Sequence, residues 1–323
     1  MAAHSIAFDL MTLLDAPGVG PGRVRKVLRH YDPACGSGLL LNIAALRETL
    51  TEAQVAALPA SREKVIRHWE ELSKKDIRAI SILDPKYPQS LKKLLRDDAP
   101  LVLLCMGNLD LLNRKSVGFC GSREATEKGI ATAWASAELL AKEGINIVSG
   151  FATGVDMNAH RAALASGGTT SIVLAEGILR FRVKKEILEL WNEERTLVIS
   201  EFGPNLPWSV SHAMQRNRTI CGLSRALILI EACTTGGSIE AGRNSLRLGL
   251  PLFAAVYEGM PESATGNEEL LRNGAHRLMK SRLTGRPNIH PILDAIRSDP
   301  APLENELARQ PGARIDRQIS LLD

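Results

Sequence analysis

Apolar side chains follow two different spacings along the chain, and the change between them falls near residue 75. Before that point they recur every three or four residues, which is the spacing of amphipathic helices. This spacing predicts helices over residues 6–14, 23–28, 43–50, 53–58 and 62–74. After that point short aliphatic runs begin, the first over 77–83, and they predict strands. We therefore predict a small all-helical domain over residues 1–75.

From residue 100 onward, short apolar runs alternate with longer amphipathic stretches. The runs predict strands over residues 100–106, 117–120, 145–149, 170–174, 196–200, 227–231 and 252–256. The stretches between them predict helices over residues 126–142, 157–166, 184–193 and 238–248, and a long polar loop up to residue 218. Alternating strands and helices indicate an α/β fold. We predict an extended Rossmann-like, doubly wound, mainly parallel sheet over residues 76–283.

The last segment, residues 284–323, is rich in proline, arginine and polar residues and has only short apolar clusters. It is predicted to be a short C-terminal tail rather than a further domain. Ile315, Ile319 and Leu322 are spaced for a short docking helix, and disorder fits the composition equally well.

The predicted helical domain contains the sequence APGVGPG between its first two helices. A hydrophobic residue between Gly18 and Gly20 is typical of a helix-hairpin-helix or SAM-like module, in which hairpin amides can contact a DNA phosphate. The same glycines are equally compatible with a tight turn that binds nothing.

Composition narrows the functional classes. The chain has 323 residues and a net charge of +4, which is compatible with a polyanionic partner but does not require one. Its five cysteines form no C-x-x-C pair and have no closely spaced histidines, so we predict neither a metal site nor disulfides. No apolar run approaches the length of a membrane span, and we expect a cytoplasmic protein without membrane contact.

The most informative stretch is SVGFCGSR, residues 116–123. Its first part is predicted to be a buried strand, and Gly121, Ser122 and Arg123 follow at the carboxyl end of that strand. Ligands of open α/β sheets bind at this edge, where the next helix also presents unpaired amides. A glycine, a hydroxyl and a guanidinium at this place suit a phosphate group.

Similar small-residue loops follow other predicted strands. Gly150 ends one strand, and Thr235, Gly236, Gly237 and Ser238 precede the helix after another. Free amides and hydroxyls at a helix N-terminus can bind an anion. Taken alone, this loop is better explained as a plain helix cap by Ser238. Its recurrence beside Arg123 favours a phosphate site.

Two basic stretches are candidates for contacts with nucleic acid. Arg216, Asn217 and Arg218 are predicted to end a polar loop on the side of the sheet that carries the anion loops, or else to form surface ion pairs. The second stretch contains Arg180, Phe181 and Lys184. Cations around an aromatic ring are typical of a groove for single-stranded nucleic acid, and a solvated start of a helix is the alternative.

Catalytic patterns are few. Asp156 and His160 are one helical turn apart and could act as an acid–base pair, although a structural role is more typical of such spacing. The sequence contains no G-x-S-x-G elbow, no Walker A motif and no G-x-G-x-x-G after a predicted strand. We therefore expect no enzymatic activity.

With these residues identified, the chain resembles the DNA-processing protein A family, also called Smf. The matching segments include VGFCGSREAT, IVSGFATGVDMNAHRAAL, QRNRTICGLS and LILIEACTTGGSIEAGRNSLRLGLPLFA. The resemblance implies a homodimer that binds single-stranded DNA without sequence preference and delivers it to the RecA recombinase, with no cofactor or metal. It also implies that Gly121, Ser122 and Arg123 bind the DNA backbone, that residues 216–218 and 236–238 complete the pocket, and that Asp156 and His160 are structural.

The chain departs from the family pattern at several places. The usual Tyr-Pro turn is replaced by residues 179–183, the Phe-Pro before the R-N-R triplet is Ala213-Met214, and no winged-helix-like C-terminal domain is predicted. An alternative resemblance exists to nucleotide-sensing domains of antiviral defence and to phosphoribohydrolases, whose PGGxGTxxE loop is similar to CTTGGSIEA. In that loop Thr235 stands where the proline is expected.

Overall fold

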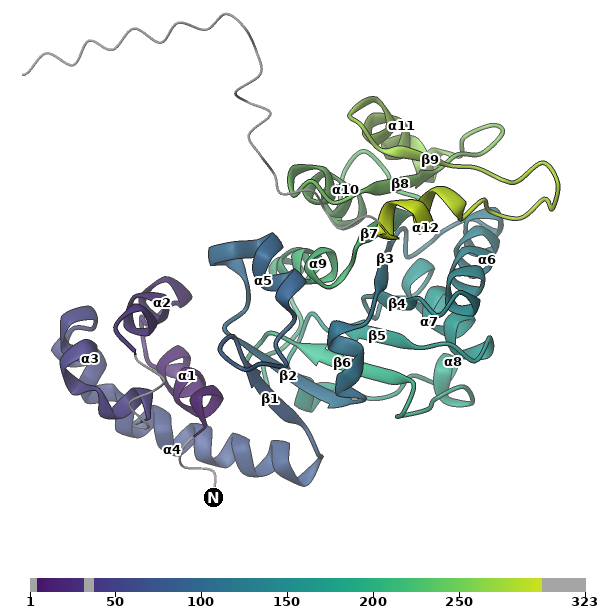
Figure 1. Cartoon of the computed structure of the whole chain (residues 1–323). Helices are drawn as coiled ribbons and strands as arrows, with labels where there is room; N and C mark the ends of the chain where they lie inside the picture. Colours follow the sequence, from purple (N-terminus) through teal and green to yellow (C-terminus); the bar gives the residue numbers. More distant parts are fainter. Residues whose placement is uncertain (1–4, 32–37, 298–323) are drawn as a thin grey trace, which may run out of the picture.

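The computed structural model describes residues 5–31 and 38–297 (Figure 1). Its first part is helical, as the spacing predicts. The helices are α1 (Ile6–Asp15), α2 (Pro21–Arg29), the 3-10 turn η2 (Leu39–Leu41), α3 (Ile43–Thr49) and α4 (Glu52–Lys74). Phe8 of α1 packs edge-on against Trp69 of α4, with ring centroids 5.5 Å apart. The turn between α1 and α2 places Gly18 at a φ of 70°, and its carbonyl accepts a hydrogen bond from Gln54 Nε2.

Helix α4 is continuous where the sequence predicted two helices. It begins with a capping box formed by Thr51 and Gln54, and it runs through Pro59. Leu58 and Val65 are both buried against the rest of the helical part, on either side of the proline. Packing of this face therefore outweighs the lost backbone hydrogen bond at the proline.

The described residues contain one nine-stranded sheet in the order β1-β2-β6-β5-β4-β3-β7-β8-β9. The strands are β1 (Arg78–Ser81), β2 (Val102–Gly107), β3 (Ser116–Cys120), β4 (Asn146–Ser149), β5 (Thr170–Val173), β6 (Thr196–Ser200), β7 (Ala226–Leu229), β8 (Leu252–Ala255) and β9 (His276–Leu278). Strand β2 is antiparallel to both β1 and β6, and every other neighbouring pair is parallel. The predicted mainly parallel α/β sheet is confirmed.

Helices cover both faces of this sheet (Figure 1). They are α5 (Gln89–Leu95), α6 (Glu127–Lys142), α7 (Val155–Ala165), α8 (Lys185–Leu188), α9 (Val210–Leu223), α10 (Gly237–Arg247), α11 (Thr265–Arg272) and α12 (His290–Arg297). Shorter 3-10 turns are η3 (Arg96–Asp98), η4 (Leu109–Asn113), η5 (Ile178–Arg180) and η6 (Glu262–Ala264). In β7, Leu227 joins the apolar cluster of one face and Ile228 that of the other, which is the packing of a doubly wound sheet.

Three sequence predictions in this region were wrong. Residues 210–223, expected to belong largely to a loop, form α9, because its buried face carries Arg216 and Asn217 and so breaks the apolar pattern. The helix expected over 184–193 ends at Leu188. The segment from residue 284, expected to be a tail, contains α12, and Ile292 of this helix is buried in the apolar cluster on one face of the sheet.

The suggested docking residues Ile315, Ile319 and Leu322 lie outside the described residues, and the division into domains stays a prediction. No helix among the described residues is long and apolar enough to cross a bilayer.

The order of the strands creates a switch point between β3 and β7. The chain winds from β3 through β4 and β5 to β6 in one direction, and from β7 through β8 to β9 in the other. At such a point the connections leave in opposite directions and open a crevice at the carboxyl ends of the strands. The loop after β3 is the one that carries Gly121, Ser122 and Arg123.

Asn267 in α11 holds the carboxyl ends of β7 and β8 together. Its side chain is fully buried and donates hydrogen bonds to the carbonyls of Ile230 (2.8 Å) and Ala255 (3.0 Å). It also accepts one from the backbone amide of Ala232 at 3.0 Å. Three backbone groups near the switch point therefore depend on one amide side chain.

We predict that Asn267→Ala lowers the free energy of unfolding by about 3 kcal/mol, because it leaves these buried backbone groups without partners. Urea denaturation followed by circular dichroism measures the change. Asn273→Ala is the matched control, because the side chain of Asn273 is exposed and donates to the carbonyl of Glu269, within its own helix end. Equal stability of the two variants would contradict the role of Asn267.

Candidate nucleic-acid interface

The loop after β3 is packed tightly on one side and open on the other. A Cβ atom at Gly121 would lie 2.5 Å from Val155 Cγ2, so the chain passes α7 at a distance that requires glycine here. The carbonyl of Ser122 accepts a hydrogen bond from the Val155 amide at 3.2 Å, and its hydroxyl accepts one from the Glu124 amide at 3.0 Å. Arg123 is exposed at the tip of the loop. The backbone of the loop is therefore held in place, while the Arg123 guanidinium is open to solvent.

The loop after β7 is bound to the loop after β3. Ser238 Oγ donates a hydrogen bond to the carbonyl of Gly121 at 2.7 Å. The cap of α10 is Gly236, with a φ of 101°, so the alternative that Ser238 merely caps this helix was wrong. Thr235, Gly236 and Gly237 are exposed at the N-terminus of α10. Their amides lie at the positive end of the helix dipole and beside the first loop.

Helix α9 brings two further predicted residues beneath these loops. Arg216 is only 7% exposed, and its Nη1 donates a hydrogen bond to the carbonyl of Val173 at 3.0 Å. A Cβ atom at Gly150 would overlap this guanidinium, so glycine there makes room for it. Asn217 Nδ2 donates to the carbonyl of Gly237 at 3.1 Å. The triplet is thus helical and largely buried, not the end of a loop.

Arg218 lies apart from the two neighbouring residues of its triplet. Its Nη2 forms an ion pair with Asp98 Oδ2 at 2.5 Å. The alternative that the triplet forms surface ion pairs thus describes Arg218, while Arg216 and Asn217 hold the strand ends and the α10 loop. Arg216 Nε is buried and has no hydrogen-bond partner among the described residues. A buried guanidinium with a free donor adds positive charge below the loops.

The second basic stretch does not form a stacking site. Phe181 is 7% exposed and packs against Phe151 (ring centroids 5.3 Å apart) and Trp191 (5.8 Å apart). The prediction that this ring stacks on bases was wrong, because an aromatic side chain between basic residues can equally serve the core. Lys184 Nζ donates to the carbonyl of Phe151 at 2.5 Å, and Arg180 remains exposed.

Asp156 and His160 lie on α7 but do not contact each other through hydrogen bonds. Asp156 accepts hydrogen bonds from Ser149 Oγ at 2.9 Å and from the Ala152 amide at 3.3 Å. His160 is fully buried, and its Nε2 donates to the carbonyl of Gly150 at 2.6 Å. Burial lowers the pKa of His160 to about 4, so the ring is neutral near pH 7. These contacts hold the end of β4 in place and form no acid–base pair.

Two further residues near the switch point were not identified from the sequence. Glu231 is fully buried and accepts hydrogen bonds from Thr126 Oγ1 (2.6 Å), the Thr126 amide (3.0 Å) and Ser263 Oγ (2.8 Å). Its carboxylate therefore occupies the N-terminus of α6. A glutamate directly after the apolar run LILI was the available signal. The other is Trp208, which is 47% exposed and lies beside Arg123.

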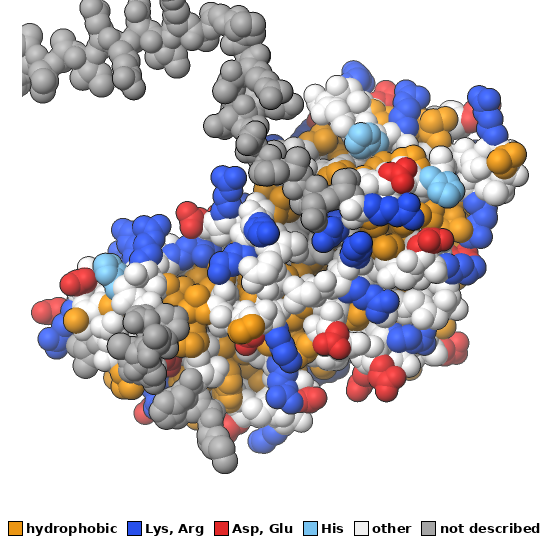
Figure 2. Space-filling model, in the orientation of Figure 1, with side chains coloured by type: hydrophobic (Ala, Val, Ile, Leu, Met, Phe, Trp, Pro, Cys, Tyr) orange, Lys and Arg blue, Asp and Glu red, His pale blue; other side chains and the backbone are white. Residues whose placement is uncertain are grey.

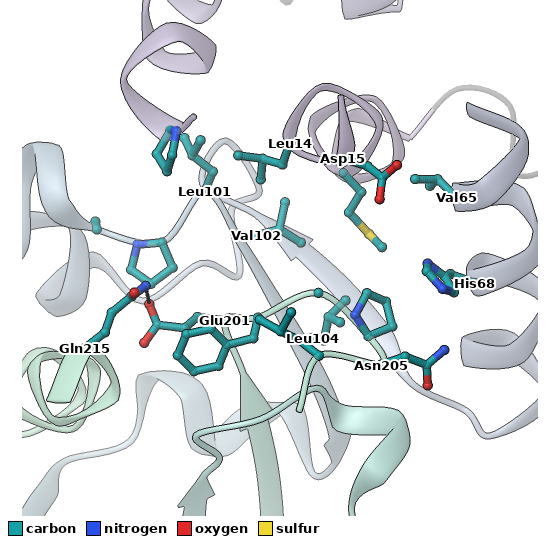
Figure 3. A pocket seen from close by; sticks show the side chains of 18 of the residues that line it. Leu14, Asp15, Val65, His68, Leu101, Val102, Leu104, Glu201, Asn205 and Gln215 are labelled. Atoms are coloured by element: carbon teal, nitrogen blue, oxygen red, sulfur yellow. Dashed lines mark hydrogen bonds between the residues drawn. The ribbon is translucent and has the colours of Figure 1, made fainter. Parts of the chain in front are cut away.

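A separate groove lies between the helical part and the sheet (Figure 3). Its volume is about 820 Å³, and apolar residues such as Leu14, Val65 and Leu104 form much of its wall. Glu201 lies at its edge and accepts hydrogen bonds from Gln215 Nε2 (2.9 Å) and Thr219 Oγ1 (2.8 Å). Burial raises the pKa of Glu201.

The charged residues that line this groove are of both signs. They are Asp15, Arg25, Lys64, Asp97, Asp98, Glu201 and Arg218. Because four carboxyl groups accompany three cations there, the groove suits a polyanion less well than the strand-end loops. Figure 2 shows a band of Lys and Arg side chains across the face that it presents, with apolar side chains between the two parts of the molecule.

No group of three potential metal ligands is found among the described residues. Cys105, Cys120 and Cys221 are buried free thiols, and burial raises the pKa of each. Cys233 is exposed and free, and Cys35 lies outside the described residues.

We predict that His160 makes stability depend on pH below 6.5. Its pKa is lower in the folded than in the unfolded chain, so the unfolded chain binds the proton first and stability falls as the pH drops from 6.5 towards 4. Between pH 7 and pH 5 this amounts to about 2 kcal/mol. Urea denaturation at both pH values should give a smaller loss in His160→Gln than in the wild type. The same loss in both proteins would disprove the assignment.

Comparisons with known proteins place this chain among relatives. The family model described as DNA recombination-mediator protein A matches residues 78–283. DNA processing protein DprA of Streptococcus pneumoniae is 35% identical over 199 residues, which cover 61% of this chain and 69% of the relative. Protein Smf of Synechocystis is 28% identical over 324 residues, which cover 95% of this chain and 76% of the relative.

Solved structures of the same kind of protein share the fold. The structure of DprA from Streptococcus pneumoniae has a TM-score of 0.71 and 30% identity, and the match covers 85% of this chain and 95% of that one. A structure that describes the single-stranded DNA binding mode of DNA processing protein A from Helicobacter pylori has a TM-score of 0.56 and 26% identity, with 70% and 96% covered. This chain belongs to the DNA recombination-mediator protein A family.

Proposed function

We propose that this protein binds single-stranded DNA without sequence preference at the carboxyl ends of β3 and β7. The observation that carries the proposal is the hydrogen bond from Ser238 to Gly121, which joins two amide-rich loops at the switch point of the sheet. Arg123 lies at one side of this junction, and the exposed N-terminus of α10 lies at the other. Together they form the proposed phosphate site.

The chemistry of this site favours the DNA backbone over a particular base. Its donors are the guanidinium of Arg123 and the backbone amides of residues 235–237, which suit phosphate oxygens and carry no sequence information. Arg216 adds a buried positive charge beneath them, beside Gly150. The related Helicobacter pylori protein is described as binding single-stranded DNA, which supports the same ligand here.

The α10 loop gives less support to nucleotide hydrolysis. Glu240 is the acidic residue that the alternative reading requires, and its carboxylate pairs with Arg243 at 2.5 Å and with Arg247 at 3.4 Å. Both oxygens of this carboxylate are thus engaged by guanidinium groups and are not free to contact a substrate or a water molecule. We therefore propose a binding protein without enzymatic turnover.

We predict that Arg123→Ala weakens binding of oligo-dT by about 1 to 3 kcal/mol, because a charge-assisted contact to phosphate is lost. The logarithmic slope of affinity against salt should fall by about 0.7, the value for one contact to a single strand. Fluorescence anisotropy over a salt series measures both quantities. Arg218→Ala should weaken binding less, because Asp98 already competes for that guanidinium.

Arg272→Ala is the matched control, because Arg272 is an exposed arginine on α11 that pairs only loosely with Glu268. It should bind oligo-dT like the wild type. Mononucleotides added as competitors should not displace the oligonucleotide. Displacement by mononucleotides at similar concentration, or wild-type affinity of Arg123→Ala, would overturn the site.

The proposed role extends to recombination. We propose that the protein acts as a homodimer and delivers the bound strand to RecA, as the DNA-processing protein A resemblance implies. Immobilised protein is expected to retain RecA in the presence of oligo-dT and to retain less in its absence. A pull-down with purified RecA measures this. Equal amounts of RecA recovered with and without immobilised protein would exclude the hand-off while leaving DNA binding intact.

A further inference from the structure

Trp208 is unlike the other tryptophans of the chain. It is 47% exposed, whereas Trp69, Trp134 and Trp191 are partly buried and pack against the apolar clusters. Exposing so much of an indole ring to water sacrifices apolar burial. Leu206 and Val210, two positions away on either side, are exposed as well, and exposed apolar side chains next to a charged site are typical of a ligand-binding surface.

The loop that carries Trp208 is fixed on both sides of the ring. The Leu206 amide donates to the carbonyl of Gly203 at 2.9 Å, and the Gly177 amide donates to the carbonyl of Leu206 at 2.8 Å. On the other side, His212 Nδ1 lies 3.1 Å from the carbonyl of Pro207. Because the backbone of this loop is already ordered, binding of a ligand to the ring loses little conformational entropy of the loop.

Trp208 also lies beside the proposed phosphate site. The guanidinium carbon of Arg123 lies over the indole, 5.6 Å from the ring centroid. An aromatic ring and a cation that contact each other can bind one nucleotide together. The ring stacks on the base, and the cation binds the phosphate. This pairing joins the loop after β3 to the loop after β6, two segments that the sequence separates widely.

We propose that Trp208 is a stacking platform for one base of the bound strand, with Arg123 on the adjacent phosphate. The inference rests on the proposed DNA-binding function and deepens it. Any base can stack on an indole, so the platform adds affinity without sequence preference. It supplies the aromatic group that Phe181, buried between Phe151 and Trp191, does not provide.

The first test compares oligo-dT with an abasic oligonucleotide of the same length. Trp208→Ala should weaken binding of oligo-dT by about tenfold and leave binding of the abasic strand unchanged, because only the former has bases to stack. Arg123→Ala should weaken binding of both strands, because both carry phosphates. Equal affinity of Trp208→Ala and wild type for oligo-dT would overturn the platform alone. Failure of the wild type to bind either strand would overturn the proposed function, and the platform with it.

The second test uses intrinsic fluorescence. Oligo-dT should quench the wild type, and Trp208→Phe should lose that quenching while retaining much of the affinity, since a phenyl ring also stacks. Trp134→Phe is the matched control, because Arg161 lies 5.6 Å from the Trp134 centroid in the same kind of pair on α6 and α7. Quenching that persists in Trp208→Phe, or that disappears in Trp134→Phe, would overturn the assignment.

Discussion

The two loops of the candidate site are joined by a hydrogen bond from Ser238 Oγ to the carbonyl of Gly121, between residues 117 positions apart. Each loop is also held from elsewhere, the first by the Val155 amide on the carbonyl of Ser122 and the second by Asn217 Nδ2 on the carbonyl of Gly237. The bond fixes the end of β3 and the start of α10 relative to each other, next to the loop that carries Arg123. Parallel neighbouring strands make this possible, because β3 and β7 end at the same edge.

A buried cation is the second constraint. Arg216 lies beneath the strand ends with one hydrogen bond to Val173, and it leaves Gly150 no room for a side chain. Burying a guanidinium is costly unless its donors are satisfied. A polyanion bound above it would supply part of the missing compensation. Arg216 therefore links the packing of the strand ends to the proposed phosphate site.

The sequence was sufficient for the fold class, because each parallel strand is a short, almost wholly apolar run. It was insufficient for α9. The buried face of that helix carries the polar residues Arg216 and Asn217, which interrupt the helical spacing of apolar side chains. The loop residues Gly121 to Arg123 could be placed at a strand end from spacing alone. Other features depend on tertiary contacts and leave no local pattern in the sequence. They are the hydrogen-bond partner of Ser238, the burial of Phe181 and the exposure of Trp208.

Glu231 has a consequence for the chemistry that this sheet can support. In Rossmann-type enzymes the helix after the first strand at the switch point holds the pyrophosphate of a dinucleotide. Here that helix is α6, and the N-terminus of α6 already holds the carboxylate of Glu231. A side chain of this chain thus accepts hydrogen bonds at the place where such a helix would otherwise present free amides. The N-terminus of α10, on the other side of the switch point, is exposed, so an anion can reach it.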